Sequence, residues 1–93
     1  MIDYTDKVVI ITGGASGLGY AAALSIAKQG GKLVLVDMNK DGLEKSRNEI
    51  VAAVPDAQIE TVEANVTSED DVKNYVNFTV GKFGKIDGFP FYK

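Results

Sequence analysis

The residues with the clearest chemical meaning lie in one short stretch, residues 12–19, which reads Thr-Gly-Gly-Ala-Ser-Gly-Leu-Gly. Glycines let the backbone turn tightly, and they let main-chain N–H groups approach an anion without a Cβ in the way. A helix that begins here adds unpaired N–H groups and the positive end of its dipole. This chemistry suits a pyrophosphate. The alternative is a tight strand-to-helix turn that binds nothing.

A second signal, the carboxylate of Asp37, lies about twenty residues beyond the glycines. The glycines follow the apolar run at residues 8–11, and Asp37 follows the apolar run at residues 33–36. A strand, a glycine turn, a helix and an acid at this distance are much stronger evidence for a pyrophosphate site than glycines alone. A triphosphate loop would end in Gly-Lys-Ser/Thr, whereas this loop ends Gly17-Leu18-Gly19.

Composition limits the alternatives. The chain has 93 residues, a net charge of −3, and neither cysteine nor histidine. This length predicts a single small domain over residues 1–93. We expect no disulfide, no metal site and no histidine base. The scattered basic residues argue against binding to nucleic acid or to an anionic membrane. No apolar run is long enough to span a bilayer, and a strand from residue 7 leaves no room for a signal peptide, so we expect a cytoplasmic protein.

The periodicity of apolar residues predicts alternating strands and helices around these signals. The expected strands are residues 7–12, 32–37 and 58–65, with a fourth that begins at 86–89. The expected helices are residues 17–29, residues 40–54 and a third that follows Ser68, with a turn at 81–85. Asn39 and Ser68 have the right chemistry for N-caps, and Asp71 stands three residues after Ser68 in capping-box position. Gly30 is the expected left-handed helix end.

Each helix has an apolar face that we expect to pack on a sheet, formed in the second helix by Leu43, Ile50, Ala53 and Val54. For the first, the predicted inward residues are Leu18, Ala21, Ala22, Ser25 and Ile26. For the third, they are Val72, Tyr75, Val76, Thr79 and Phe83. The first two strands are apolar without alternation, which is typical of parallel strands covered on both faces.

The order β-α-β-α-β-α-β requires right-handed crossovers and a parallel sheet. The strand order 3-2-1-4 is that of the mononucleotide-binding half of a doubly wound fold. We therefore predict an α/β fold, a Rossmann-like parallel sheet in which the doubly wound arrangement is incomplete.

The pattern Thr-Gly-x-x-x-Gly-x-Gly resembles the short-chain dehydrogenase/reductase family, and the resemblance extends from residue 7 to about residue 89. It implies an NAD(H)-binding oxidoreductase region. The residues implied for the pyrophosphate are Gly13, Ser16, Gly17, Leu18 and Gly19. Asp37, followed by Met38, is implied for the adenosine ribose. Asn65 and Val66 stand where the family usually has an aspartate-valine pair near the adenine, and the Asn65 amide oxygen can accept from the adenine amine.

The resemblance fails beyond the fourth strand. The family has Asn-Asn-Ala-Gly there, whereas this chain has Phe89-Pro90-Phe91-Tyr92. The family's catalytic serine and Tyr-x-x-x-Lys pair have no counterpart, since no tyrosine here is followed four residues later by lysine. We therefore predict no catalytic residues, and a truncated cofactor-binding half that binds NAD without activity of its own.

Two alternatives remain open at this point: an interaction module with a vestigial nucleotide site, and one part of an enzyme that a second chain completes. NAD is the expected cofactor over NADP, because Asp37 stands where a 2′-phosphate would lie and Ala15, Ser16 and Met38 supply no cation. We also expect the second sheet face to leave an apolar patch over the first two strands. A homodimer through this face or the fourth-strand side, with Phe89 and Phe91, would cover it.

Overall fold

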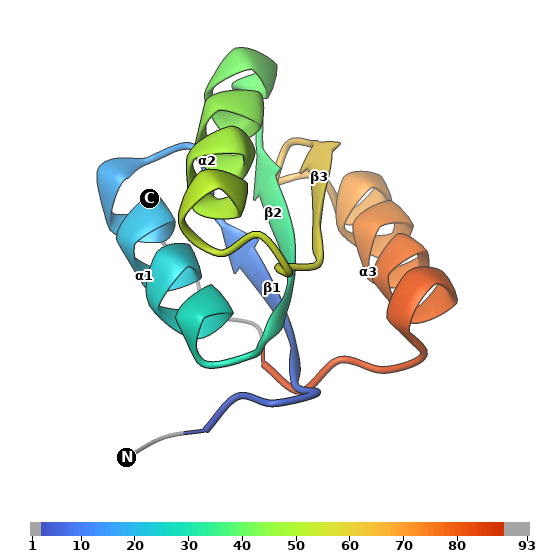
Figure 1. The fold of residues 1–93 in the computed structure, drawn as a ribbon. Helices are drawn as coiled ribbons and strands as arrows, with labels where there is room; N and C mark the ends of the chain where they lie inside the picture. Colours follow the sequence, from blue (N-terminus) through green and yellow to red (C-terminus); the bar gives the residue numbers. More distant parts are fainter. Residues whose placement is uncertain (1–2, 89–93) are drawn as a thin grey trace.

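The computed structural model describes residues 3–88. Three parallel strands alternate with three helices (Figure 1). Their bounds are β1 Val8–Thr12, α1 Gly17–Lys28, β2 Lys32–Asp37, α2 Lys40–Ala53, β3 Ile59–Glu63 and α3 Glu69–Phe83. The sheet has the order β1-β2-β3, with Thr12 beside Val36 and Asp37 beside Glu63. The predicted α/β fold and the 3-2-1 part of the predicted strand order are thereby confirmed.

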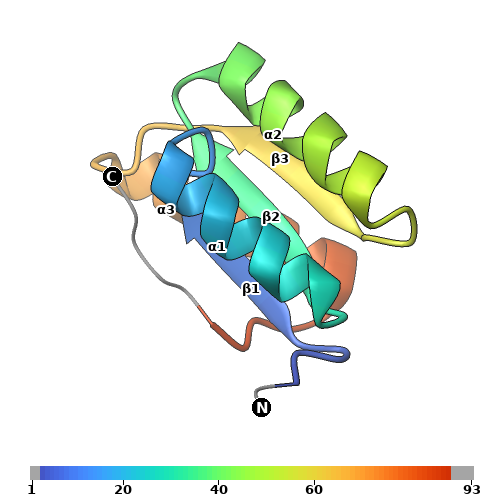
Figure 2. The ribbon, with the colours of Figure 1, turned by 60° about the vertical axis from the view of Figure 1, so that its left-hand side comes forward.

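The sheet lies between two helical layers. Helices α1 and α2 cover one face and α3 covers the other (Figures 1 and 2). Alternate residues of each strand enter different cores, so that Val9 and Ile11 join the core under α1 and α2. Ile10 packs on the other side with Val34 and with Tyr75 of α3. The apolar runs are therefore covered on both faces, as expected for central parallel strands.

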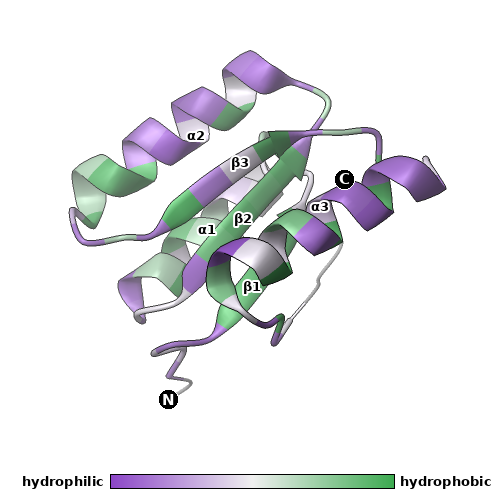
Figure 3. Ribbon diagram, turned by 90° about the vertical axis from the view of Figure 1, so that its right-hand side faces the viewer, coloured by the Kyte–Doolittle hydropathy of each residue, from purple (hydrophilic) through white to green (hydrophobic). Residues whose placement is uncertain are grey.

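The predicted apolar patch over the first two strands is wrong for the described residues. Val8, Ile10, Val34 and Val36 are each 0% exposed. On this face α3 and the residues that follow it form the cover, since Val72, Val76, Phe83 and Ile86 pack against the core. Figure 3 shows the apolar colour concentrated along β1 and β2, with hydrophilic colour on the outer side of the helices. Among residues 3–88, the large apolar side chains that remain exposed are Leu18, Met38, Phe78 and Val80.

The helix boundaries follow local chemistry. The side chains of Ser16, Asn39 and Ser68 each accept a hydrogen bond from the backbone N–H three residues later, as N-caps do. Gly30 has φ +87°, which agrees with the predicted left-handed turn after α1. The predicted turn at 81–85 begins too early, because α3 continues to Phe83 and Gly84 provides the left-handed end. Strand β3 is shorter than predicted, since it runs from Ile59 to Glu63 rather than over residues 58–65.

The inward face of α1 differs from the prediction. Its buried residues are Gly19, Ala23, Ile26 and Ala27. Of these, only Ile26 was predicted to face inward. Leu18 is 62% exposed instead. Because α1 is rich in small residues, several of its faces have similar hydropathy. The helix turns Gly19 inward because only a glycine fits against the backbone of Gly13 and Gly14.

One contact stands where the fourth strand was predicted. Gly88 forms an isolated parallel bridge with Val9, on the edge of β1 opposite β2. The N–H of Ile10 donates to the Gly88 carbonyl at 3.0 Å, and the N–H of Asp87 donates to the Val8 carbonyl at 2.7 Å. Phe89 and the residues after it lie outside the described part, so a fourth strand, and its place in the order 3-2-1-4, remain predictions.

The Asp87 carboxylate links this segment to the start of β1. Its Oδ2 accepts the Val8 N–H at 2.8 Å and lies 3.2 Å from the Lys85 ammonium. The Val8 N–H, helped by the charges of Lys85 and Lys7, holds the pKa of Asp87 below its usual range. The pKa of Asp87 is lower in the folded chain than in the unfolded chain. The ionised carboxylate therefore stabilises the fold at pH values above the ordinary carboxyl pKa. That contribution is lost as the pH falls through the folded pKa.

We therefore expect Asp87→Asn to lower the free energy of unfolding near neutral pH. The difference from the wild type should shrink as the pH falls below about 4, where the unfolded carboxyl becomes protonated. Urea unfolding at a series of pH values measures it. Asp56→Asn, at an exposed position, is the matched control. A difference that is the same at pH 7 and at low pH would contradict the role given to the Asp87 charge.

Candidate functional site

The predicted site residues gather at the carboxyl edge of the sheet. In a parallel sheet the carboxyl ends of neighbouring strands lie side by side, and ligands of open α/β sheets bind there. The glycine loop follows β1, Asp37 and Met38 lie at the end of β2, and Asn65 and Val66 follow β3. Backbone hydrogen bonds join these segments. The N–H of Gly14 donates to the Val36 carbonyl at 3.1 Å, and the N–H of Ala64 donates to the Asp37 carbonyl at 3.0 Å.

The glycine loop is closed by the hydroxyl of Ser16. It donates to the Gly13 carbonyl at 2.7 Å and accepts from the Gly19 N–H at 3.0 Å. The N–H of Ser16 also donates to the Gly13 carbonyl, at 2.9 Å. Gly13 has φ +74°, a backbone conformation that side-chain-bearing residues rarely adopt. Ser16 therefore shapes the loop and caps α1, a role that its resemblance-based placement at the pyrophosphate did not include.

The other glycines of the loop differ in how much space a Cβ would have. A Cβ on Gly19 would overlap the Gly13 carbonyl oxygen, and one on Gly14 would come within 2.8 Å of the Leu35 Cβ. A Cβ on Gly17 would meet nothing within 4 Å. Close packing therefore explains Gly14 and Gly19, whereas the space beside Gly17 is open.

Backbone donors at the start of α1 face no acceptor of the chain. Within residues 3–88, no carbonyl or side chain accepts from the N–H of Gly17 or of Leu18. These are two of the N–H groups that a helix leaves unpaired at its beginning, where its dipole is positive. Gly17 and Leu18 are both exposed, so this end of the helix is open to solvent. The arrangement can accept an anion.

Asp37 connects the glycine loop to the start of α2. Its Oδ2 accepts from the Ala15 N–H at 3.1 Å, and its Oδ1 accepts from the Asn39 N–H at 3.0 Å. The carboxylate is half-buried, and each oxygen has a lone pair left for a further donor. An ionised carboxylate beside the loop is suited to accept hydroxyl hydrogens and to repel a second anion.

Met38 and Asn65 line one cavity of about 260 Å³, together with Glu63, Ala64 and Asp71. Asn65 differs here from the prediction that its amide oxygen accepts from a base. Its Oδ1 already accepts from the Thr67 N–H at 2.9 Å and from the Thr67 hydroxyl at 2.7 Å. Asp71 also departs from the predicted capping box. The Asp71 Oδ2 accepts the Asn65 N–H at 2.8 Å, while the N–H of Ser68 donates to the Asn65 carbonyl.

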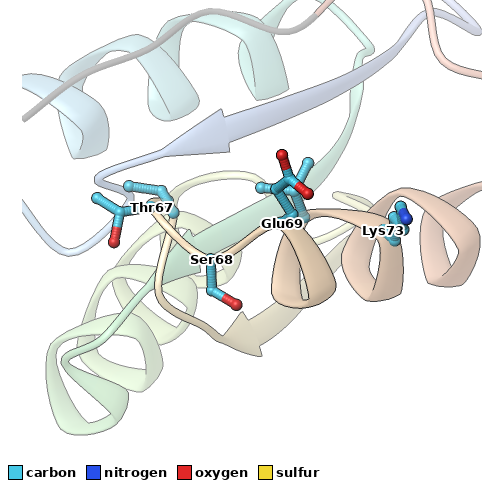
Figure 4. A pocket seen from close by; sticks show the side chains of 6 residues that line it. Thr67, Ser68, Glu69 and Lys73 are labelled. Atoms are coloured by element: carbon cyan, nitrogen blue, oxygen red, sulfur yellow. The ribbon is translucent and has the colours of Figure 1, made fainter.

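Val66 lies toward a different cavity, of about 350 Å³, at the start of α3. Figure 4 shows Thr67 and Ser68 on the turn that leads into α3, with Glu69 and Lys73 on its first turns. Val66 and Val72 supply the apolar part of the lining. The structure thus brings Met38 and Asn65 together and separates Val66 from them.

Two further findings concern the described residues. None of the helices in residues 3–88 is long and apolar enough to cross a membrane. In the same part of the chain, no three acidic side chains come together as a metal site would require.

Comparison with known proteins agrees with this geometry. The model of the short chain dehydrogenase family matches residues 7–90. The chain belongs to this family. Among its relatives is levodione reductase of Leifsonia aquatica, which is 49% identical over 86 residues. That match covers 92% of this chain and 32% of the relative, so this short-chain dehydrogenase sequence spans about a third of the length of levodione reductase.

Solved structures of the family have the same fold. The crystal structure of levodione reductase superposes with a TM-score of 0.90 over 92% of this chain and 33% of that one. The crystal structure of NAD+-bound xylitol dehydrogenase is 33% identical, with a TM-score of 0.88 over 95% of this chain and 33% of that one. An NADPH-dependent 3-quinuclidinone reductase from Rhodotorula rubra is 29% identical, with a TM-score of 0.84 over 94% of this chain and 32% of that one.

Sequence reasoning missed the two side-chain contacts that shape the site: Asp37 with Ala15, and Asp71 with Asn65. The spacing of these residues along the chain, 22 positions in one pair and 6 in the other, gives no reason to expect a contact. The one available signal was residue type, because Asp side chains commonly accept backbone N–H bonds at turns and helix starts.

The glycines of the loop provide a matched pair of substitutions. We expect Gly19→Ala to destabilise the fold by about 3 kcal/mol, because a Cβ there overlaps the Gly13 carbonyl and must displace backbone. Gly17→Ala should leave the stability unchanged or raise it by up to about 1 kcal/mol, since its Cβ meets nothing and alanine restricts the unfolded chain. Urea or thermal unfolding measures both. Equal effects of the two substitutions would contradict the described packing of the loop.

Proposed function

We propose that this chain is the cofactor-binding region of a short-chain dehydrogenase-type oxidoreductase and that it binds NAD(H) through one domain over residues 1–93. The observation that carries the proposal is the loop after β1. There, unpaired N–H groups of Gly17 and Leu18 stand at the start of α1, beside the carboxylate of Asp37. The loop suits the pyrophosphate, with Gly13, Ser16 and Gly19 shaping it, and Asp37 suits the adenosine ribose hydroxyls.

Charge favours NAD over NADP in this site. A 2′-phosphate placed about 4 Å from the Asp37 carboxylate would cost roughly 4 kcal/mol at an effective dielectric constant near 20, before screening by salt. No cation offsets this repulsion at the positions that flank it, which hold Ala15, Ser16 and Met38. The similar structures include both an NAD+-bound and an NADPH-dependent enzyme, so the preference rests on these residues of the chain itself.

We propose that these 93 residues do not catalyse hydride transfer by themselves. Reduction of a carbonyl by hydride transfer needs a proton donor of suitable pKa beside the substrate. The tyrosines Tyr4, Tyr20 and Tyr75 are followed four residues later by Val8, Leu24 and Thr79, so none forms a Tyr-x-x-x-Lys pair. We propose that the chain binds the dinucleotide without turnover and that any activity requires residues supplied by further polypeptide.

Self-association is a second proposal, and the surface of α3 supports it. Phe78 is 41% exposed and Val80 is 45% exposed on the helix that covers the second sheet face. The strand residues of this face are buried, so Phe78 and Val80 are the exposed large apolar side chains there. They are two residues apart and lie on opposite flanks of the outer side of α3. A homodimer that includes this helix would remove them from water. The proposed participation of Phe89 and Phe91 concerns residues outside the described part.

The cofactor preference is tested by titrating the chain with NAD and with NADP, followed by calorimetry or by NMR. After a discount for salt screening, we expect at least about tenfold tighter binding of NAD, which corresponds to about 1.4 kcal/mol. Asp37→Ala should narrow this ratio, because it removes the charge that repels the 2′-phosphate.

The control is Asp41→Ala, which removes the same charge from the exposed first turn of α2 without a contact to the loop. It should leave the ratio of NAD to NADP affinity as in the wild type. Equal affinities in the wild type, or an Asp37→Ala variant with an undiminished ratio, would refute the preference.

Self-association is tested by light scattering at micromolar concentration. We expect a dimer in the wild type and a shift toward monomer in Phe78→Asp, because a charge in a dimer interface is desolvated without a partner. Asn48→Asp, at an exposed position of α2 on the other side of the sheet, adds the same charge away from α3 and should leave the dimer intact. A wild-type monomer with cooperative unfolding rules the dimer out.

A further inference from the structure

The outer edge of β3 is one border of the described sheet. Strand β3 pairs with β2 on one side only, and Gly88 pairs with β1 at the opposite border. Along a strand, successive residues direct their N–H and carbonyl groups alternately to the two sides. The Leu33 N–H donates to the Gln58 carbonyl, and the Ala64 N–H donates to the Asp37 carbonyl, so the even-numbered residues face β2. The odd-numbered residues therefore direct their backbone groups outward.

The outward backbone groups of β3 belong to Ile59, Thr61 and Glu63. Arg47 of α2 covers one of them, because its Nε–H donates to the Ile59 carbonyl at 3.2 Å. Within residues 3–88, the N–H and carbonyl groups of Thr61 and Glu63 have no hydrogen-bond partner. A row of unpaired backbone groups on an edge strand is a template for pairing with a further strand.

Helix α2 gives this edge a second wall. Figures 2 and 3 both show α2 alongside β3, on the side away from β2. A hollow of about 310 Å³ lies between the helix and the strand, and its lining is entirely polar or charged: Glu44, Arg47, Asn48, Glu60 and Thr61. Recognition by strand addition obtains affinity from main-chain hydrogen bonds and specificity from side chains on alternate residues. The edge and the hollow provide both elements.

Two charges mark the ends of the edge. Among residues 3–88, neither Arg47 nor Glu63 forms an ion pair. The bond to the Ile59 carbonyl holds Arg47 at one end through Nε, which leaves its two terminal nitrogens for a carboxylate. Ile59 belongs to the core under α1 and α2, so the side chains at positions 59, 61 and 63 lie on the α2 side of the strand. Partner side chains opposite these positions lie on the same side.

We propose that the edge of β3 and helix α2 bind an extended segment of a partner protein, which adds to the sheet as an antiparallel strand. An acidic residue of the segment lies opposite Ile59 and meets Arg47, and a basic residue lies opposite Glu63. In an antiparallel pair these two partner residues are four positions apart, with the basic residue first. The residue midway between them exchanges two main-chain hydrogen bonds with Thr61. This site does not depend on dinucleotide binding.

The probe is the peptide acetyl-Lys-Val-Thr-Val-Glu-amide, titrated into the isotopically labelled chain and followed by NMR. We expect a Kd of roughly 0.1–1 mM, because a few main-chain hydrogen bonds must offset the ordering of a flexible segment. The amide signals of Thr61 and Glu63 should shift on binding. The matched control peptide carries an N-methyl group on its threonine, which removes the donor to the Thr61 carbonyl. It should bind at least about tenfold more weakly.

A charge reversal in the chain tests the role of Arg47. The wild type should bind the original peptide about threefold more tightly than acetyl-Lys-Val-Thr-Val-Lys-amide, as is typical of an exposed ion pair. Arg47→Glu should invert this order. Lys45→Glu is the matched control, since it makes the same change at an exposed position of α2 that does not line the hollow. It should keep the wild-type order. Thermal unfolding of each variant shows whether it is folded.

Each outcome decides a definite point. A wild type whose Thr61 and Glu63 signals do not move at millimolar peptide overturns the site. Equal binding of the N-methylated peptide overturns strand addition as the mode of binding. A folded Arg47→Glu variant with the wild-type order of affinities overturns the role of Arg47. Titration of the same sample with NAD tests the proposed function separately, so either proposal can fail alone.

Discussion

The end of β2 is the point on which the rest of the site depends. The Val36 carbonyl accepts the N–H of Gly14, the Asp37 carboxylate accepts the N–H of Ala15, and the Asp37 carbonyl accepts the N–H of Ala64. The loops that follow β1 and β3 are therefore both fixed to the same two residues. β2 is the central strand of the described sheet and its apolar residues are fully buried, so both loops are attached to a well-packed element.

A buried parallel sheet makes this anchor possible. The strands β1 and β2 contribute side chains to two cores, one under α1 and α2 and the other under α3. Each fully buried aliphatic side chain contributes about 1.5–3 kcal/mol relative to an exposed one. Polar groups at the sheet edge then sit at the boundary between this core and solvent, where they are partly desolvated but still accessible. Asp37 and Asn65, both half-buried, are examples.

The fold was largely predictable because its signals are local and repeated. Uninterrupted apolar runs predicted β1 and β2, and the N-caps Ser68 and Asn39 predicted where helices begin. The errors came where several local solutions have similar energies. Helix α1 is rich in small residues, so its hydropathy did not distinguish the true inward face from its neighbour. The end of α3 was set by the left-handed Gly84, which lies inside the predicted turn at 81–85.

The sequence by itself determined the chemical groups of the candidate site: a glycine loop between a strand and a helix, an acid after the second strand, and Asn65 after the third. Spacing and residue type were sufficient because each lies at the end of an element with a clear apolar pattern. The tertiary structure decided how those groups are used. It turned the Asn65 oxygen toward Thr67, placed Asp71 behind Asn65, and attached Asp37 to the loop. The physical reason is that an amide or a carboxylate can satisfy its hydrogen bonds in several directions, and only the assembled backbone fixes which donors are within reach.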